Sequence, residues 1–192
     1  TLDERQKVFS LFSSRIATRK PASYLLQKAY IGDHAFYVDE RVIVPRSYIG
    51  ELLKDGLETI IDNPDAITSV LDLCTGSGCL AILAALAYPD AAVTGIDCSP
   101  DALEVAQKNV ASYGLETRIT LLRSDLFSAV PNTRFDLILS NPPYVSQKAV
   151  ADFPPEYRAE PVIAHLGGKD GLDFVRQILK DAPGYLSEDG IL

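Results

Sequence analysis

From Ser69 onward, runs of apolar residues alternate with helical patterns, and this alternation limits the chain to few folds. The runs "SVLDLC", "AVTGIDC", "RITLLRS" and "FDLILS" have the character of buried strands. Two helical patterns separate the first three runs: "CLAILAALAY", and "SPDALEVAQKNVASYG" with Ser99 as N-cap, Pro100 at its first position and Gly114 at its end. Strands that alternate with helices predict a parallel sheet covered on both faces, and right-handed crossovers make this α/β sheet doubly wound.

The flanking segments predict further elements. Helical spacing over residues 3–19 is ended by Lys20-Pro21, and a short segment, "SYLLQKAYIG", closes on Gly32. The stretch "HAFYVDERVIV" suggests a β-hairpin whose tip is "DER", residues 39–41, and a helix is expected over about residues 48–62. A helix near residues 172–181 precedes "GIL", which would begin a fifth strand. Because the chain stops there and contains no Met, we expect both of its ends to be truncated.

The composition restricts the class of function. With 47% hydrophobic residues and a net charge of −8, the 192 residues favour one well-buried domain and argue against a duplex DNA binder, which needs clustered Lys and Arg. The longest apolar run, Leu80 to Tyr88, is too short to cross a membrane, and no secretory leader opens the chain. The three cysteines form no CxxC pair, and His34 and His165 are far apart. We therefore expect a cytoplasmic protein without a metal site.

The charge is uneven along the chain. Residues 1–30 carry six basic side chains against Asp3 and Glu4, a balance of +4, which leaves −12 for the remainder. The basic helix expected at residues 3–19 could contact RNA or a ribosomal surface. The alternative, an ordinary solvated helix face, is the more common meaning of such a pattern.

The loop after the first strand, "DLCTGSGCLA", carries Gly76 and Gly78, with Ala81 three positions further on. Glycines allow a tight turn and the close approach of a ligand to the backbone at the start of the following helix. The pattern fits the dinucleotide fingerprint GxGxxG/A, and Asp97 lies 21 residues after Gly76, near the spacing of an acid that binds ribose hydroxyls. This arrangement suits nicotinamide cofactors and S-adenosylmethionine alike, and an ordinary strand-to-helix turn is the remaining alternative.

Two further carboxylates favour S-adenosylmethionine over a nicotinamide cofactor. Asp72, just inside the loop, suits a cationic sulfonium and ammonium better than an anionic pyrophosphate. Asp125 ends the third strand in "RSDLF", where it could accept a hydrogen bond from an adenine amine. The segment that follows the fourth strand decides between the two cofactors.

That segment is "NPPY", Asn141 to Tyr144, and the strand ends of such sheets form the ligand crevice. The lone pair of an amide or adenine nitrogen is delocalised, so methyl transfer to it requires acceptors for both N–H hydrogens. The Asn141 side-chain oxygen and a rigid carbonyl that precedes a proline would supply them, and Pro142 and Pro143 would keep them preorganised. Tyr144 would stack on the planar group. The plainer alternative is that two prolines simply end the strand.

The combination "DLCTGSG…GID…SDLF…SNPPY" resembles class I S-adenosylmethionine-dependent methyltransferases that act on amino or amide nitrogens. The segments "RKPASYLL", "FYVDERVIVPRSYIGELL" and "EYRAEPVIAHLGGKDGLD" are similar to the HemK/PrmC-type protein-glutamine methyltransferases. Within that family, "VDERVIVPRS" resembles the PrmB branch, which methylates a glutamine of large-subunit ribosomal protein three. The resemblance covers essentially the whole chain.

The resemblance implies a fold and a set of site residues. The fold is a Rossmann-like sheet with strand order 3-2-1-4-5 in the part present and its last two strands missing. The implied domains are a remnant of an N-terminal helical domain (1–33), a β-hairpin linker (34–47) and the methyltransferase domain (48–192). The cofactor is placed at Asp72, Cys74, Thr75, Gly76, Ser77, Gly78, Asp97, Asp125 and Leu126, and the substrate amide at Pro142, Pro143 and Tyr144, with Asn141 contacting both. Cys74 departs from the family pattern, because many relatives have glycine there.

Three functions remain open on these grounds. The first is glutamine methylation of a ribosomal protein, with a peptide release factor as the related protein substrate. The second is methylation of adenine in nucleic acid, which would require a basic groove that the charge of −12 does not favour. The third is a cofactor-binding or assembly protein without catalysis, which would have no use for rigid acceptors at the strand end.

Overall fold

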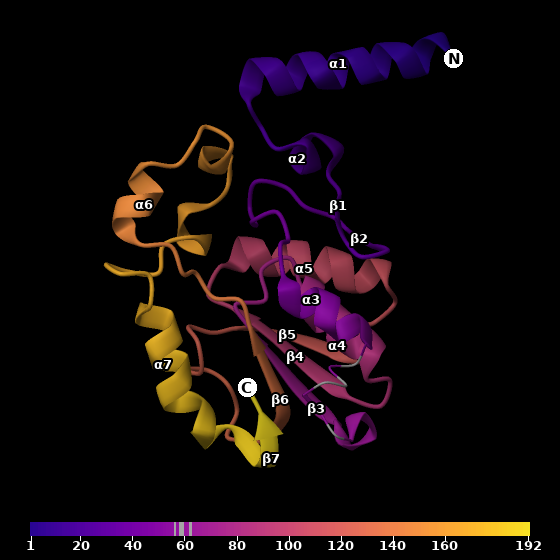
Figure 1. Ribbon diagram of the computed structural model, residues 1–192. Helices are drawn as coiled ribbons and strands as arrows, with labels where there is room; N and C mark the ends of the chain where they lie inside the picture. Colours follow the sequence, from indigo (N-terminus) through magenta and orange to yellow (C-terminus); the bar gives the residue numbers. More distant parts are fainter. Residues whose placement is uncertain (56, 58–59, 62) are drawn as a thin grey trace.

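The computed structural model describes residues 1–55, 57, 60–61 and 63–192. Within these residues the central sheet has five parallel strands in the order β5-β4-β3-β6-β7 (Figure 1). The strands are β3 (Ser69–Leu73), β4 (Ala92–Asp97), β5 (Ile119–Arg123), β6 (Phe135–Ser140) and β7 (Leu186–Ile191). The predicted order 3-2-1-4-5 is therefore confirmed, with β3 at the centre of the sheet.

Helices cover both faces of this sheet, as the doubly wound prediction requires (Figure 1). Because successive residues of a strand point to opposite faces, Val70 packs in the cluster built around α4, whereas Leu71 packs in the cluster that contains Ile178 of α7. The long helices of the domain are α4 (Cys79–Ala87), α5 (Pro100–Ser112) and α7 (Asp173–Asp181). Shorter helices are α3 (Tyr48–Leu52), α6 (Gln147–Ala151), η1 (Leu53–Asp55), η2 (Pro64–Ala66), η3 (Tyr157–Ala159), η4 (Val162–Ala164) and η5 (Ala182–Gly184).

The predicted ends of α5 are confirmed by their backbone geometry. The Ser99 side chain accepts a hydrogen bond from the Ala102 backbone N–H, and Pro100 occupies the first turn. Gly114 just beyond the helix has φ 66°, the left-handed conformation that glycine tolerates best. These local signals determine where α5 begins and ends. Because α5 starts just after β4, they also limit where β4 ends, at Asp97.

The N-terminal region differs from the sequence prediction. The first helix is confirmed as α1 (Leu2–Thr18), and α2 spans Ala22–Leu26. The predicted hairpin with its tip at residues 39–41 is wrong: β1 (Ala29–Ile31) pairs with β2 (His34–Phe36), and Gly32 with φ 54° lies in the turn. The Asp39 carboxylate instead accepts hydrogen bonds from the backbone and guanidinium of Arg41. This local ring bends the chain without pairing two strands.

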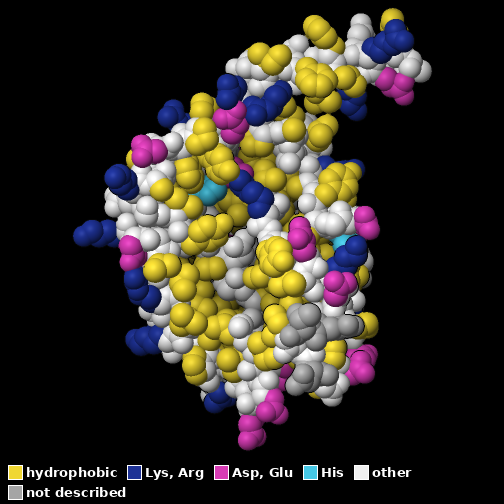
Figure 2. All heavy atoms as spheres, viewed as in Figure 1, with side chains coloured by type: hydrophobic (Ala, Val, Ile, Leu, Met, Phe, Trp, Pro, Cys, Tyr) yellow, Lys and Arg dark blue, Asp and Glu magenta, His cyan; other side chains and the backbone are white. Residues whose placement is uncertain are grey.

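Two other expectations concern the same half of the molecule. The helix predicted over residues 48–62 is found as α3 followed by η1, and its positions 56, 58, 59 and 62 lie outside the described residues. Helix α1 extends away from the body with apolar side chains along it, and none of its residues is buried (Figure 2). In the described part of the chain, no helix combines the length and apolar character needed to cross a bilayer.

Candidate functional site

A cavity of about 350 Å³ opens at the carboxyl ends of the central strands, in the size range of small-molecule sites. We call it the strand-end pocket. Its predicted members are Cys74, Gly76, Asp97, Asp125, Leu126, Asn141 and Pro143. Its other walls include residues 41–43, Pro161, Ile163, Ala164 and Phe174. Residues from four strand ends thus share one pocket, which is the expected position of a ligand in an open α/β sheet.

The glycine loop has the shape that its sequence predicts. Gly76 and Gly78 have φ values of 55° and 78°, and Cys74 has φ 60° in the same left-handed region. A Cβ at Gly78 would lie 3.1 Å from the Ala106 Cβ, so glycine allows the start of α4 to approach α5. Cys74 has a side chain where glycine would adopt this conformation more easily. The loop therefore keeps its turn despite the departure from the family pattern.

Asp97 joins the glycine loop to the start of α5. Its Oδ2 accepts a 2.9 Å hydrogen bond from the Gly76 backbone N–H, and its Oδ1 accepts one of 2.9 Å from Ser99 N–H. Each carboxylate oxygen has a second acceptor site, and Asp97 lines the strand-end pocket. The carboxylate is therefore held rigidly at the pocket wall, where it could accept hydrogen bonds from ligand hydroxyls.

Other predicted cofactor residues lie behind the loop, away from the pocket wall. Asp72 is fully buried; its Oδ2 accepts hydrogen bonds from the Thr75 hydroxyl (2.5 Å) and the Ala81 backbone N–H (3.0 Å). Its Oδ1 has no hydrogen-bond partner among the described residues, and burial raises the pKa of Asp72 to about 7. Thr75 and Ser77 are also buried. Asp72 thus supports the loop from beneath, and direct cofactor contact by these residues stays a prediction.

The turn after β5 places Asp125 and Leu126 at the pocket. Leu126 has φ 45°, and its carbonyl accepts a 2.6 Å hydrogen bond from the Ser124 hydroxyl. The Ser124 oxygen in turn accepts a hydrogen bond from the Ala129 backbone N–H. Ser124 therefore locks a turn that presents one carboxylate and one apolar side chain to the same cavity.

The four residues of "NPPY" point in different directions. Asn141 and Pro143 line the strand-end pocket, whereas Pro142 lines a second cavity, and Tyr144 is 63% exposed. The Asn141 Nδ2 donates to the Arg46 carbonyl at 3.5 Å. Just beyond, Val145 pairs with Leu166 in an isolated parallel bridge. Asn141 is therefore the polar side chain that this segment contributes to the cavity.

Sequence reasoning missed several residues that shape the site. Residues 41–43 form one wall because they do not pair as a hairpin strand. Asn109 is buried in α5; its Nδ2 donates to the carbonyls of Ser77 and Tyr37, and its Oδ1 accepts from Tyr37 N–H. It thereby ties the glycine loop to the N-terminal segment. A polar residue on the helix side that faces the sheet was the only signal in the sequence.

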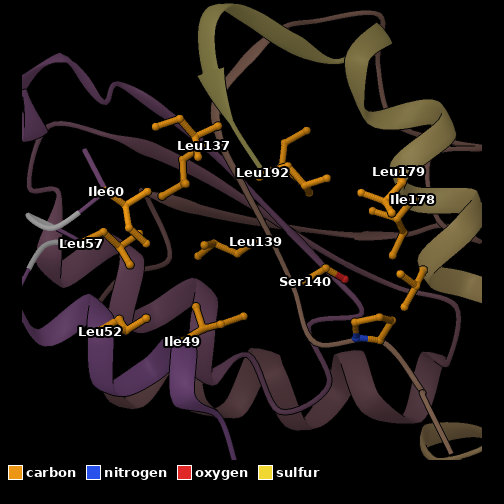
Figure 3. Close-up of a pocket in the computed structure, with 14 residues that line it drawn as sticks. Ile49, Leu52, Leu57, Ile60, Leu137, Leu139, Ser140, Ile178, Leu179 and Leu192 are labelled. Carbon is orange, nitrogen blue, oxygen red and sulfur yellow. The ribbon is translucent and has the colours of Figure 1, made fainter. Parts of the chain in front are cut away.

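The second cavity, which we call the apolar pocket, has about 370 Å³ and lies beside β6. Figure 3 shows apolar side chains turned into it from several elements. They include Ile49 and Leu52 from α3, Leu137 and Leu139 from β6, Ile178 and Leu179 from α7, and Leu192. The lining contains no charged side chain among the described residues. Ser140 contributes a polar side chain to this lining, but its hydroxyl donates to the Leu73 carbonyl. The described residues of the apolar pocket therefore include no charged group that could activate a reacting group.

The strand-end pocket, by contrast, has groups that fit S-adenosylmethionine. The Asp97 carboxylate can accept from ribose hydroxyls, and Asp125 adds a second negative charge that complements a cationic ligand. A Cβ at Gly76 would meet no atom closer than the Cys74 carbonyl at 4.0 Å, so the backbone there is open to close approach. Over the described residues, no group of three or more His, Cys, Asp or Glu side chains is placed to hold a metal ion.

Comparisons with known proteins agree with this chemistry. A family model described as "Methyltransferase small domain" matches residues 51–153. The chain is 55% identical, over 99% of its length, to the ribosomal protein uL3 glutamine methyltransferase of Bradyrhizobium diazoefficiens, and 54% identical, over 98%, to that of Bordetella pertussis. It spans 61% and 63% of the lengths of these two relatives. A solved SAM-dependent methyltransferase from Agrobacterium tumefaciens shares the fold, with a TM-score of 0.56, 21% identity and coverage of 85% of this chain and 50% of that one.

Proposed function

We propose, since the chain belongs to the methyltransferase small domain family, that it contains the catalytic site of an S-adenosylmethionine-dependent methyltransferase acting on a glutamine side chain of ribosomal protein uL3. The observation that carries the proposal is that Asn141 and Asp97 line the same cavity, although they come from different strand ends. The names of relatives at 54–55% identity support the substrate.

In this proposal the cofactor is held by the glycine loop and the acids around it. Gly76 provides open backbone, Asp97 binds the ribose, and Asp125 and Leu126 flank the adenine. S-adenosylmethionine, when bound, supplies an electrophilic methyl group on a sulfonium. The acidic lining complements that positive charge, and the apolar walls formed by residues 42–43 and Leu126 exclude water from it.

The substrate amide is held by Asn141 and its neighbours. The Asn141 Oδ1 accepts one N–H of the amide, and the backbone carbonyl before a proline accepts the other. This pair of acceptors turns the nitrogen lone pair toward the reacting methyl and stabilises the more pyramidal transition state. Tyr144 is exposed just after Asn141 and the two prolines in the chain, and its ring would stack on the substrate as it enters.

The N-terminal helix offers less for RNA than its charge indicates. Arg15 and Arg19 both pair with Glu156, and Lys20 pairs with Glu40. Half of the basic side chains of residues 1–30 are therefore already paired with carboxylates. They favour a protein substrate over a nucleic acid.

A methyl-transfer assay tests the proposed function. The purified protein is incubated with S-adenosylmethionine labelled in the methyl group and, in parallel, with unmethylated uL3, a peptide release factor, or RNA and DNA. Mass spectrometry then locates any added methyl. We expect one methyl on a glutamine of uL3. Label on the release factor in place of uL3 would contradict the proposed substrate. Label on adenine would contradict amide methylation and show an amine methyltransferase instead. No label on any of them would contradict the proposal as a whole.

A further inference from the structure

A side-chain cluster centred on the buried carboxylate of Glu160 lies beside the strand-end pocket and has no role in the chemistry described so far. It consists of Arg46, Tyr157, Glu160 and His165. Glu160 is 4% exposed, and its carboxylate lies 2.5 and 2.6 Å from the Arg46 guanidinium. The His165 Nε2 lies 2.9 Å from Glu160 Oε2, and the Arg46 guanidinium carbon lies 5.0 Å from the centre of the Tyr157 ring. A buried carboxylate requires hydrogen-bond partners to offset its desolvation, and here the half-exposed Arg46 provides them.

Glu160 forms hydrogen bonds with more than one group of the irregular segment 44–46. Its Oε1 accepts a hydrogen bond from the Val44 backbone N–H at 3.2 Å in addition to the one from Arg46 Nη2. The Arg46 Nε in turn donates to the Val44 carbonyl at 3.2 Å. Residues 44–46 lie in no strand or helix, so these bonds take the place of a regular ladder. Glu160 therefore determines where the Arg46 carbonyl lies.

The cluster reaches "NPPY" from two sides. On one side the Asn141 Nδ2 donates to the Arg46 carbonyl. On the other side the Val145 N–H donates to the His165 carbonyl at 2.8 Å, and Gly167 N–H donates to the Val145 carbonyl at 2.9 Å. The contacts form a closed ring that runs from Asn141 through Arg46, Glu160 and His165 to Val145. The segment from Asn141 to Val145 is thus held at both ends by the backbone carbonyls of Arg46 and His165, which lie outside the pocket.

The ring has a direct consequence for the Asn141 amide. An asparagine side chain has one acceptor oxygen and one donor NH₂ group, which point in different directions. Because the donor faces the Arg46 carbonyl, the acceptor oxygen is left for a ligand in the strand-end pocket. The 3.5 Å contact is long, so it selects an orientation and adds little binding energy.

We propose that Arg46 and Glu160 are positioning residues for methyl transfer. Glu160 holds Arg46, and the Arg46 carbonyl keeps the Asn141 amide turned with its oxygen toward the substrate N–H. The proposal rests on the proposed function of Asn141. It assigns a role in catalysis to residues that touch neither cofactor nor substrate.

The central experiment compares Glu160→Gln with the matched control Glu156→Gln. Glu156 lies in the same loop and also bonds two arginines, Arg15 and Arg19, but at the surface beside α1. We expect Glu160→Gln to lower kcat about 10- to 100-fold, the scale for a misplaced reactive group, with the Kd for S-adenosylmethionine unchanged within about two-fold. Glu156→Gln should leave both within about two-fold. A wild-type kcat in Glu160→Gln, or an equal loss in both variants, would overturn the proposal.

A double variant tests whether Arg46 and Glu160 affect kcat through one shared linkage or independently. If Arg46 and Glu160 act through one linkage, Arg46→Gln/Glu160→Gln should be no slower than the slower of the two single variants. If the kcat reductions of the two single variants multiply in the double variant, the two residues do not act on Asn141 through one linkage. Thermal unfolding of every variant checks that the fold is intact. If Glu160→Gln does not fold, Arg46→Lys takes its place, because it keeps the positive charge but loses the Nε that donates to the Val44 carbonyl.

A readout without turnover separates this inference from the proposed function. The side-chain NH₂ resonances of Asn141, assigned by their loss in Asn141→Ala, report its amide environment by NMR. They should shift in Glu160→Gln and stay in place in Glu156→Gln. Unchanged resonances in Glu160→Gln refute the positioning role even if the enzyme is slow. If the wild type methylates none of the substrates tested, the proposed function fails while these resonances still decide whether Glu160 orients Asn141.

Discussion

The strand-end pocket and the apolar pocket have nearly the same volume, about 350 and 370 Å³, yet only one of them is equipped for chemistry. The strand-end pocket brings Asp97, Asp125 and Asn141 together from three strand ends. The apolar pocket is lined by aliphatic side chains from α3, β6 and α7. Cavity size therefore does not identify a site, whereas convergent polar groups on fixed backbone do.

The two cavities have different structural causes. The strand-end pocket lies where the connections from β3 and from its neighbours leave the sheet on opposite faces, so a crevice is built into the topology. The apolar pocket lies where β7 pairs with β6 in an irregular register, at Phe135↔Leu186 and Leu137↔Ile191. Four predictions, from the largest effect to the smallest, test the contrast.

The largest effect concerns the buried acid beneath the strand-end pocket. The pKa of Asp72 is raised from 3.8 to about 7 by burial, so the folded state binds its proton more tightly than the unfolded state. Its stabilising contribution is complete below pH 3.8 and is lost as the pH rises through about 7. From pH 4 to pH 8, wild type should lose about 4 kcal/mol of unfolding free energy relative to Asp72→Asn. Urea denaturation across this pH range measures the free energy of unfolding, and Asp90→Asn, at an exposed position, is the control. Parallel pH curves for wild type and Asp72→Asn would refute the raised pKa of Asp72.

In the apolar pocket, truncating a buried aliphatic side chain should lower stability without changing cofactor affinity. Leu137 is 1% exposed and packs in the core, so Leu137→Ala should cost about 3 kcal/mol of unfolding free energy. The Kd for S-adenosylmethionine should stay within about two-fold. Leu179→Ala, at a 60% exposed residue of the same lining, should change stability by less than about 0.5 kcal/mol. A clear loss of cofactor affinity in Leu137→Ala would mean that the two pockets are coupled.

In the strand-end pocket, Asn141→Ala should have the opposite profile. We expect kcat to fall about 100-fold because an acceptor used in the transition state is lost, while the Kd for S-adenosylmethionine changes only a few-fold. Single-turnover kinetics and calorimetric titration measure the two quantities. The exposed Asn132→Ala provides the matched control. Near-wild-type turnover in Asn141→Ala would remove the role assigned to this side chain.

The smallest effect is expected at the ribose-binding acid. Asp97→Ala should weaken S-adenosylmethionine binding about 10-fold, the scale of a lost charge-assisted hydrogen bond, at little cost to kcat under saturating cofactor. The control is Asp101→Ala, which removes an exposed carboxylate from the first turn of α5. Equal dissociation constants for wild type and Asp97→Ala, measured by titration calorimetry, would exclude Asp97 as the ribose ligand.

Much of the fold follows from local patterns in the sequence. Ser99, Pro100 and Gly114 delimit α5, and the apolar runs place β3 to β6 with errors of one residue or less at most ends. The hairpin prediction was wrong because hydrogen bonds between Asp39 and Arg41 form a local turn without strand pairing. The observed hairpin, β1 with β2, turns at Gly32 instead. Short apolar segments without a regular period leave such choices to packing.

The candidate site was predicted only in part. That Asp97 and Asn141 meet follows from the rule that parallel strands end at one edge of the sheet. That Pro142 and Tyr144 leave the pocket does not follow, because the bridge between Val145 and Leu166 sets the path of the chain after the strand. The direction of a side chain in irregular backbone depends on what the backbone is bonded to.

The sequence by itself determined the doubly wound sheet, the glycine loop and the identity of the polar groups at the strand ends, since each depends on spacing or on conformations favoured over a few residues. Only the tertiary structure decided which of those groups share a cavity and what holds them. Arg46 and Glu160 are separated by 114 positions, and Asn141 and Arg46 by 95. Contacts over such distances arise when whole layers pack, and a single sequence contains no periodicity that encodes them.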